Sequence, residues 1–188
     1  KIFKIILKKA DNIIANSKEF AKLLEKKFKI KVQCIYNPLN KKEVIKLSKI
    51  KSKNIFSNKK VLKIINVGRF VDQKDQITLL KAINLIKNKL KIEVRIVGRG
   101  IEEKKLSQYL YKNNLNKIVK LINFQNNPYP SINNSEIFIL TSKFEGLPNV
   151  LLEAILLNKF VISSNCSTGP KEILDNGKGG LLFEVGDH

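Results

Sequence analysis

The chain has 188 residues, 43% of them hydrophobic, and a formal net charge of +20 from 36 Lys and Arg against 16 Asp and Glu. This length suits one complete domain and part of another. The single His and the two widely separated Cys exclude a His-rich metal site and a CxxC motif. Because the chain contains no Met, we interpret it as a piece of a longer protein.

The basic residues are spread along the whole chain and rarely alternate with aromatic residues. This pattern indicates a general Lys/Ile/Asn bias, so we expect no nucleic-acid partner, with a basic nucleic-acid-binding module kept as an alternative. Such a surface would favour peripheral contact with an anionic membrane, at about 1 kcal/mol for each nearby Lys. The chain has no secretory signal, its apolar run 5–7 is too short to span a bilayer, and its Cys are expected to be reduced thiols, so we expect a cytoplasmic protein, peripheral at most on the cytoplasmic membrane face.

The first 38 residues have the pattern of a helix end, a strand, a helix and a second strand. The strands are expected at Asn12–Asn16, as a buried strand, and at Val32–Tyr36. Ser17 is a good N-cap for a Lys-rich helix that extends to about Phe28. We interpret residues 1–38 as the last βαβ unit of a preceding domain, and residues 39–60 as a solvated linker with a short surface helix.

From residue 61 onward, strands alternate with helices, which predicts an α/β fold with a doubly wound parallel sheet. Most of the strands end in glycine or small polar residues. The expected strands are 62–67, 92–97, 118–122, 136–142, 160–163 and 180–183. The expected helices are one with an apolar face formed by Leu79, Leu80, Ile83 and Ile86, one over about 102–112, one over 148–158 and a short one over 170–174.

The segment from 143 to 158 contains a buried-helix pattern with one charged exception. Pro148 is expected at the first helical position, and the helix after it is apolar on nearly every side. Glu153 lies within this helix and requires a protein donor, a basic partner or ligand hydroxyls to compensate its burial. Glu145, in the preceding loop, is expected to face the same cavity while partly exposed. The amides of Leu147, Asn149 and Val150 would form an anion site at the helix N-terminus.

In a doubly wound sheet, ligands bind at the carboxyl ends of the strands. Gly68, Arg69 and the Gly98–Gly100 turn fall at this edge, and Arg69 and Lys74 supply two cations for which a structural role is not expected. The combination predicts a ligand with both phosphates and hydroxyls, which a nucleotide-sugar provides. The sequence lacks a P-loop, a Gly-x-Gly-x-x-Gly fingerprint and an Asp-x-Asp pair. We therefore expect no metal and no cofactor.

These motifs resemble those of the group 1 (family 4) glycosyltransferases of the GT-B fold. The resemblance rests on Val67–Phe70 with Gln73-Lys74, on the Glu-x7-Glu block in 142–154, and on the block 167–174. It implies a retaining transfer from a nucleoside-diphosphate sugar, with UDP preferred, to a glycan or lipid-linked acceptor in cell-envelope polysaccharide synthesis. It also implies that Glu145 is catalytic and engages the hydroxyls of the donor sugar.

The resemblance assigns further substrate contacts. Arg69 and Lys74 would bind the diphosphate, Glu153 would accept from the ribose, and Phe124 with the two residues after it would lie near the base. The remaining expected donor-site residues are Gly68, Ser142, Gly146, Leu147, Pro148 and Asn149.

The resemblance also implies a domain division and leaves a second enzyme class to consider. Residues 1–38 would be the tail of the acceptor domain, 39–60 the linker, and 61–188 a donor-binding domain truncated at its C-terminus, so that the isolated fragment would be inactive. A nucleotide-sugar epimerase of the same architecture is the alternative enzyme, although that class lacks the Glu-x7-Glu block.

Overall fold

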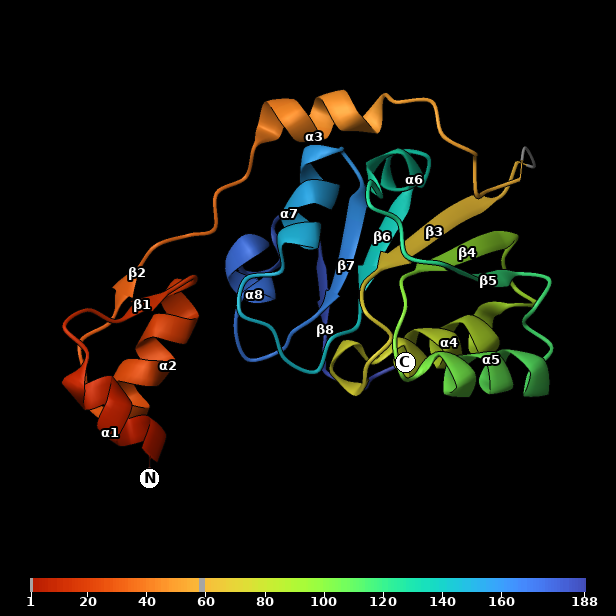
Figure 1. Ribbon diagram of the computed structural model, residues 1–188. Helices are drawn as coiled ribbons and strands as arrows, with labels where there is room; N and C mark the ends of the chain where they lie inside the picture. The colour runs from red at the N-terminus through yellow and green to blue at the C-terminus, as the bar shows by residue number, and fades with distance from the viewer. Residues whose placement is uncertain (1, 58–59) are drawn as a thin grey trace.

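The computed structural model describes residues 2–57 and 60–188, and its N-terminal part is a small unit of its own. In this unit, α1 (Ile2–Lys9) precedes a parallel pair of strands, β1 (Ile14–Ala15) and β2 (Gln33–Cys34), with α2 (Lys18–Phe28) between them. Figure 1 shows the unit, in red and orange, to one side of the main sheet. The βαβ pattern expected for residues 1–38 is therefore confirmed.

Helix α2 begins where the sequence predicts. The hydroxyl of Ser17 accepts a hydrogen bond from the amide of Phe20 at 3.1 Å, which is a side-chain N-cap. Ala21 and Leu24 are buried against the strands. The expectation of a buried first strand is wrong for Ile14, whose side chain is 57% exposed, because β1 has a single neighbouring strand and α2 packs on only one side of it.

The linker contains the expected short helix, α3 (Lys41–Ser48), but this helix is not only a solvated face. Val44 is buried and packs in the main core, where α3 contacts α6 (Tyr129–Asn133) and α7 (Asn149–Leu156). The charged side chains of α3 remain exposed, as expected. The linker residues 58 and 59 lie outside the described residues.

The main body is a six-stranded, all-parallel sheet in the order β5-β4-β3-β6-β7-β8. The chain starts in the middle of the sheet, builds outward to β5, and returns to build the other half, so the predicted doubly wound α/β fold is confirmed. Its strands are β3 (Leu62–Val67), β4 (Ile92–Val97), β5 (Val119–Ile122), β6 (Ile137–Leu140), β7 (Phe160–Ser164) and β8 (Leu181–Phe183).

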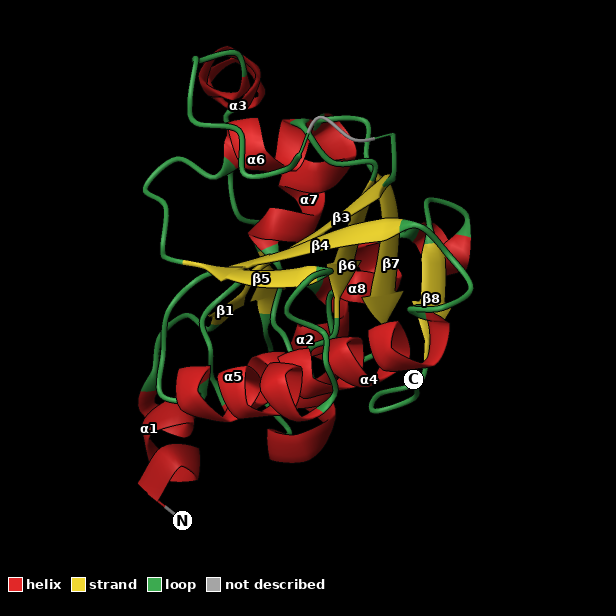
Figure 2. Ribbon diagram, turned by 90° about the vertical axis from the view of Figure 1, so that its right-hand side faces the viewer, coloured by secondary structure: helices red, strands yellow, loops and turns green. Residues whose placement is uncertain are grey.

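Helices cover both faces of the sheet (Figure 2). On one face lie α4 (Gln76–Ile86) and α5 (Glu103–Lys112), whose apolar stripes include Leu79, Ile83 and Leu106 in one buried cluster. On the other face lie α3, α6 and α7, and buried side chains such as Leu151 of α7 cluster with Phe138 of β6. The remaining elements are the turn η1 (Asp72–Lys74), between β3 and α4, and the short α8 (Pro170–Ile173) and the turn η2 (Asp175–Gly177), between β7 and β8.

A buried arginine joins the linker to the sheet. Arg95, in the middle of β4, donates from Nε to the carbonyl of Ile55 at 2.5 Å and lies over the ring of Phe56, with 5.3 Å between the guanidinium carbon and the ring centre. It also lies 3.4 Å from the carboxylate of Glu93. A buried cation requires such partners to offset its desolvation. The end of the linker is therefore held against the middle of β4.

Candidate functional site

A cavity of about 950 Å³ opens at the carboxyl edge of β3 and β4, facing the N-terminus of α7. This is the edge where doubly wound sheets bind ligands. Its volume is in the upper part of the range found for small-molecule and cofactor sites. The cavity is lined by Asn37, Val67, Gly68, Arg69, Lys74, Val97, Gly98, Arg99, Gly100, Phe124, Gln125, Asn126, Pro128, Tyr129, Glu145, Leu147, Pro148, Asn149, Val150 and Glu153.

Two strand-end loops in close contact form one wall of this cavity. A Cβ atom at Gly98 would lie 2.0 Å from the carbonyl oxygen of Gly68, so no side chain fits there. The amide of Phe70 donates to the carbonyl of Arg99 at 2.9 Å and locks the two loops together. The backbone of both loops is thus brought to the cavity surface.

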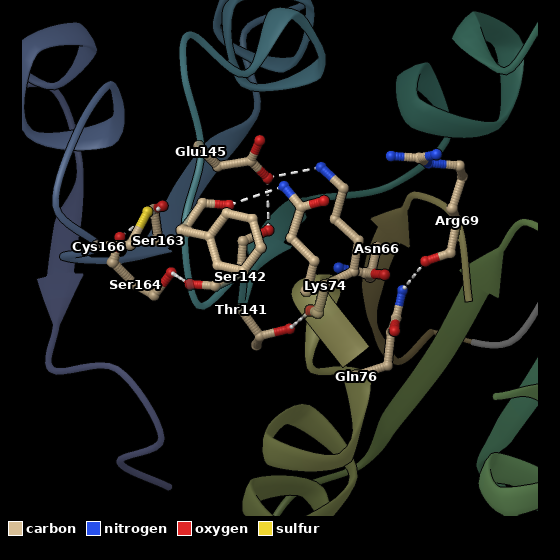
Figure 3. Close-up of polar contacts among 12 residues, drawn as sticks. Asn66, Arg69, Lys74, Gln76, Thr141, Ser142, Glu145, Ser163, Ser164 and Cys166 are labelled. Carbon is tan, nitrogen blue, oxygen red and sulfur yellow. Dashed lines mark hydrogen bonds and ion pairs between the residues drawn. The ribbon is translucent and has the colours of Figure 1, made fainter. Parts of the chain in front are cut away.

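Lys74 and Glu145 form the charged centre of the site. Lys74 Nζ lies 2.5 Å from Glu145 Oε1, and the Ser142 hydroxyl donates to the same oxygen at 2.6 Å. Figure 3 shows the three side chains converging. The side chain of Glu145 is only 8% exposed and that of Lys74 15%. Glu145 is an intermediate residue by exposure, but its carboxylate is more buried than expected. Lys74, for which no structural role was expected, is its charge partner, and the absence of a structural role stays a prediction.

The backbone around this ion pair is fixed by hydrogen bonds between η1 and the loop before α7. The Thr141 hydroxyl donates to the carbonyl of Lys74 at 2.8 Å, and the Gln73 amide group donates to the carbonyl of Phe144 at 2.9 Å. From the other side, the Thr168 hydroxyl donates to the carbonyl of Glu145. The position of the carboxylate is therefore set before any ligand binds.

Glu153 has a neutral partner. The hydroxyl of Tyr129, on α6, donates to Glu153 Oε1 at 3.1 Å. Burial raises the pKa of the Glu153 carboxyl above its usual value, and the hydrogen bond from Tyr129 offsets part of that rise. Burial, together with the nearby carboxylate, also raises the pKa of Tyr129, to about 12. The compensating group that the sequence required for Glu153 is thus a protein hydroxyl.

Two arginines extend the basic character of the cavity. The side chain of Arg69 is exposed at the end of β3 and points toward the same space as Lys74 (Figure 3). Among residues 2–57 and 60–188, the structure gives its guanidinium no hydrogen bond or ion pair. Arg99 lies over the ring of Phe124, 4.9 Å from its centre, and both line the cavity. Phe124 is 53% exposed, which leaves part of its ring available to a ligand.

Most of the site residues expected from the sequence line this cavity, and two do not. Ser142 is fully buried beneath the site, where its hydroxyl holds Glu145 and its carbonyl accepts from Ser164 at 2.6 Å. Gly146 faces the N-terminal unit, where an added Cβ would lie 3.0 Å from Asn16 Oδ1. The expected residues that line it are Gly68, Arg69, Lys74, Phe124, Glu145, Leu147, Pro148, Asn149 and Glu153. Helix α7 starts one residue later than expected, with Pro148 just before it.

Three polar residues that line the cavity were assigned no substrate contact from the sequence: Asn37, Arg99 and Tyr129. Arg99 could have been found, because Gly98-Arg99 follows its strand as Gly68-Arg69 follows the preceding one. Tyr129 could not, because α6 was not expected: a five-residue helix beside two prolines has too little periodicity to be recognised. Asn37 comes from the N-terminal unit, and its amide donates to Asn149 Oδ1 at 2.9 Å.

Within the described parts of the chain, no group of three or more His, Cys, Asp or Glu side chains is arranged to hold a metal ion. The same residues contain no helix with the length and apolarity needed to cross a bilayer. Neither finding tests ligand binding, so metal-independent binding stays a prediction.

The comparison with protein families decides the assignment. The model of the family "Glycosyl transferases group 1" matches residues 47–188, which is more than half of the chain. The chain belongs to this family. The match includes every strand of the main sheet and all the cavity residues described above except Asn37, and it favours this family over the epimerase alternative.

Similar proteins extend the likeness into the N-terminal unit. This glycosyltransferase chain is 36% identical to an uncharacterized glycosyltransferase of Methanocaldococcus jannaschii, over 92% of the chain and 44% of that relative. It is 31% identical to the N-acetylgalactosamine-N,N'-diacetylbacillosaminyl-diphospho-undecaprenol 4-alpha-N-acetylgalactosaminyltransferase of Campylobacter jejuni, over 98% of the chain and 49% of that relative. The chain thus spans about half the length of the curated relatives it matches.

A solved structure shows the same fold. The Anabaena protein HepE in complex with UDP and glucose superposes with a TM-score of 0.79 at 20% sequence identity, covering 97% of this chain and 52% of that protein. At this identity the likeness concerns the fold alone.

Proposed function

We propose that this chain is the donor-binding part of a retaining glycosyltransferase that transfers a sugar from a nucleoside-diphosphate sugar to a glycan or lipid-linked acceptor. The observation that carries the proposal is the cavity in which Lys74, Glu145, Arg69 and Glu153 face one ligand-sized space. Cations and α7 amides suit a diphosphate, whereas carboxylates suit sugar hydroxyls. One ligand that combines both groups is a nucleotide-sugar.

The geometry supports a separate role for each side chain. Arg69, whose side chain is exposed beside the cavity, would bind the diphosphate together with Lys74 and the α7 amides. Glu145 Oε1 is held by Lys74 and Ser142, which leaves Oε2 to accept from a donor-sugar hydroxyl. Glu145 is the catalytic group of this proposal. Glu153, fixed by Tyr129, would accept from the ribose, and the exposed part of the Phe124 ring would contact the base.

UDP is the nucleotide that we propose for the donor. The support comes from HepE, which has the same fold and was solved with UDP and glucose. A lipid-linked acceptor is supported by the name of the C. jejuni relative, which contains a diphospho-undecaprenol group. We place the reaction at the cytoplasmic face of the membrane, in the synthesis of cell-envelope polysaccharide.

We also propose the domain division expected from the sequence. Residues 1–38 would be the end of the acceptor domain, 39–60 the linker and 61–188 the donor-binding domain. The separate two-stranded sheet of the N-terminal unit supports the first boundary. The held end of the linker, where Arg95 binds the carbonyl of Ile55, supports the second.

The test is a calorimetric binding screen of UDP-, GDP- and ADP-sugars on the full-length protein, with and without EDTA. We expect one nucleotide class to bind at moderate salt, and EDTA to leave its affinity unchanged. The proposal would be contradicted if the protein bound none of the three nucleotide-sugars. It would also be contradicted if EDTA abolished binding and added Mg²⁺ or Mn²⁺ restored it.

A matched set of polyanions controls for the net charge of +20. A nonspecific basic surface would bind single-stranded DNA and heparin with an affinity that falls steeply with salt. We expect the preferred nucleotide-sugar to bind with a much weaker salt dependence, and unlabelled DNA not to displace it.

A further inference from the structure

Among the contacts between the N-terminal unit and the main body, several converge on the carboxylate of Glu172 on α8. Its Oε1 accepts from the amide of Lys18, and its Oε2 from the amide of Glu19, both at 3.1 Å. The hydroxyl of Tyr36 also donates to Oε1. Three donors from the N-terminal unit therefore converge on a single side chain of the main body.

These contacts complete the cap of α2. The first-turn amides of an α-helix have no acceptor within the helix and must find one elsewhere. In α2, the amide of Phe20 uses the Ser17 hydroxyl, as described above. The two amides before it use Glu172, which is more than 150 residues away in the sequence. A negative charge at this position is also favoured by the helix dipole.

At the same junction, the main body also donates a hydrogen bond to a carboxylate of the N-terminal unit. Gly169, the residue immediately before α8, donates from its amide to Glu19 Oε2 of α2 at 3.1 Å. Each unit thus supplies a carboxylate for backbone amides of the other. We name the contacts of Glu172 and Glu19 with these amides and with Tyr36 the carboxylate clamp.

The clamp leads directly to the loop that carries Glu145. Gly169 has a φ of +90° and lies so close to this loop that a Cβ there would be 2.4 Å from the carbonyl oxygen of Gly146. The preceding residue, Thr168, donates to the carbonyl of Glu145. A change in how the units meet would therefore act on the backbone on both sides of the Glu145–Gly146 peptide.

We propose that Glu172 is a positioning residue for sugar transfer: through the carboxylate clamp it sets the N-terminal unit against the loop that holds Glu145. This role rests on the proposed function, whereas the clamp itself does not. Glu172 does not line the donor cavity, so it acts through Gly169 and Thr168 and not by touching the donor. Its removal should impair transfer while leaving donor affinity unchanged.

The first test measures amide hydrogen exchange in the first turn of α2, in the full-length protein. For Glu172→Ala we expect exchange at residues 18 and 19 to accelerate roughly tenfold or more, because two charge-assisted hydrogen bonds are lost. Tyr36→Phe removes one donor but leaves these amides bonded, so its effect should be smaller. Asp175→Asn is the matched control, because Asp175 is an exposed acid at the same junction whose ion pair, with Lys178, lies within the main body.

The second test separates positioning from binding. We expect Glu172→Ala to lower kcat about tenfold, with the Kd for the donor within about twofold of the wild type. Glu172→Gln, which keeps one acceptor oxygen, should recover part of the rate. Unchanged exchange and turnover in both Glu172→Ala and Tyr36→Phe would overturn the proposal, as would a loss of donor affinity equal to the loss of turnover.

The two proposals fail in different ways. If the wild-type protein binds no nucleotide-sugar but Glu172→Ala still exposes the α2 amides, the proposed function is wrong and the positioning role falls with it, although the clamp stands. If the wild-type protein binds and transfers normally and Glu172→Ala does the same, only the inference about Glu172 is wrong.

Discussion

Glu145 and Glu153 are at the two ends of one motif and line the same cavity, but the protein holds them in opposite ways. Glu145 is held by a cation, Lys74, and by the Ser142 hydroxyl. Among the described residues, the hydrogen-bond partner of Glu153 is a neutral hydroxyl, that of Tyr129, and burial raises the pKa of Glu153. The first carboxylate has a cation as its partner, whereas the burial of the second, which has none in the described part of the chain, costs stability. Two identical residue types in one motif therefore have different energetics.

The largest expected effect is on turnover, from Glu145→Gln in the full-length protein. The amide keeps the shape but removes the charge from the group that we propose lies at the donor sugar, so kcat should fall by about two to three orders of magnitude. The Lys74 ion pair is lost as well, so stability should fall by about 1–2 kcal/mol. Steady-state kinetics and thermal melting measure the two effects, with Asp72→Asn, in the exposed pair with Lys143, as the control. Wild-type turnover would remove Glu145 from the catalytic site.

Lys74→Ala should weaken UDP binding about tenfold to hundredfold, the equivalent of one charge-assisted hydrogen bond. It also leaves Glu145 largely buried without its cation, so we expect the melting temperature to fall too. Calorimetry and melting of this variant are compared with those of Lys143→Ala, a neighbouring lysine whose ion pair is exposed. Equal affinities for the two variants would contradict the assigned role of Lys74.

Arg69→Ala sharpens the comparison because it removes a cation without a charge partner among the described residues. We expect an affinity loss of about tenfold and a change in unfolding free energy within about 0.5 kcal/mol. Denaturant titration and calorimetry measure both quantities. A clear loss of stability would mean that Arg69, like Lys74, has a structural role.

The smallest expected effect is a gain in stability from Glu153→Leu. At pH 7 the variant should be more stable by ~0.5–1 kcal/mol, a value reduced by the partial exposure of the side chain and by the lost Tyr129 hydrogen bond. A carboxyl with a raised pKa in the folded state destabilises the protein only where it is ionised. The gain should therefore be largest at neutral pH and disappear below the unfolded pKa of about 4.5.

Melting curves between pH 4 and 8 test whether the stability gain of Glu153→Leu rises with pH. Glu103→Gln, at an exposed glutamate of α5, controls for the loss of one negative charge. Binding of UDP to Glu153→Leu should weaken, because the ribose would lose its acceptor. A destabilised variant at pH 7 would show that Glu153 contributes to folding more than its burial costs.

The sequence predicted the strands around the site closely because their signals are local. β3 and β4 have the expected bounds, since each is a short run rich in Ile and Val that is followed by Gly-Arg and is therefore easy to delimit. The cavity followed from topology, because parallel strands bring their carboxyl ends to one edge. The burial of Glu145 could not be predicted, since it depends on Lys74, 71 residues earlier in the chain.

The partners of Glu172 and Glu153 could not be predicted from the sequence for a similar reason. Glu172 appears in the sequence as an ordinary polar residue of a short helix, and nothing in its neighbourhood indicates the amides of Lys18 and Glu19. Tyr129 was hidden in a helix too short to be periodic. Each of these contacts joins segments that meet only after the chain has folded.

The hydrogen bond from Arg95 to the carbonyl of Ile55 has a consequence for limited proteolysis. The exposed lysines at 49, 51 and 53 lie between α3 and this anchor, and such surface segments are where proteases cut first. After a cut there, Val44 would still hold α3 on α6 and α7, and Arg95 would still hold residues 55 and 56 on the sheet. We expect the cut protein to elute from a size-exclusion column as one particle, because packing contacts would keep the short N-terminal fragment on the rest of the chain.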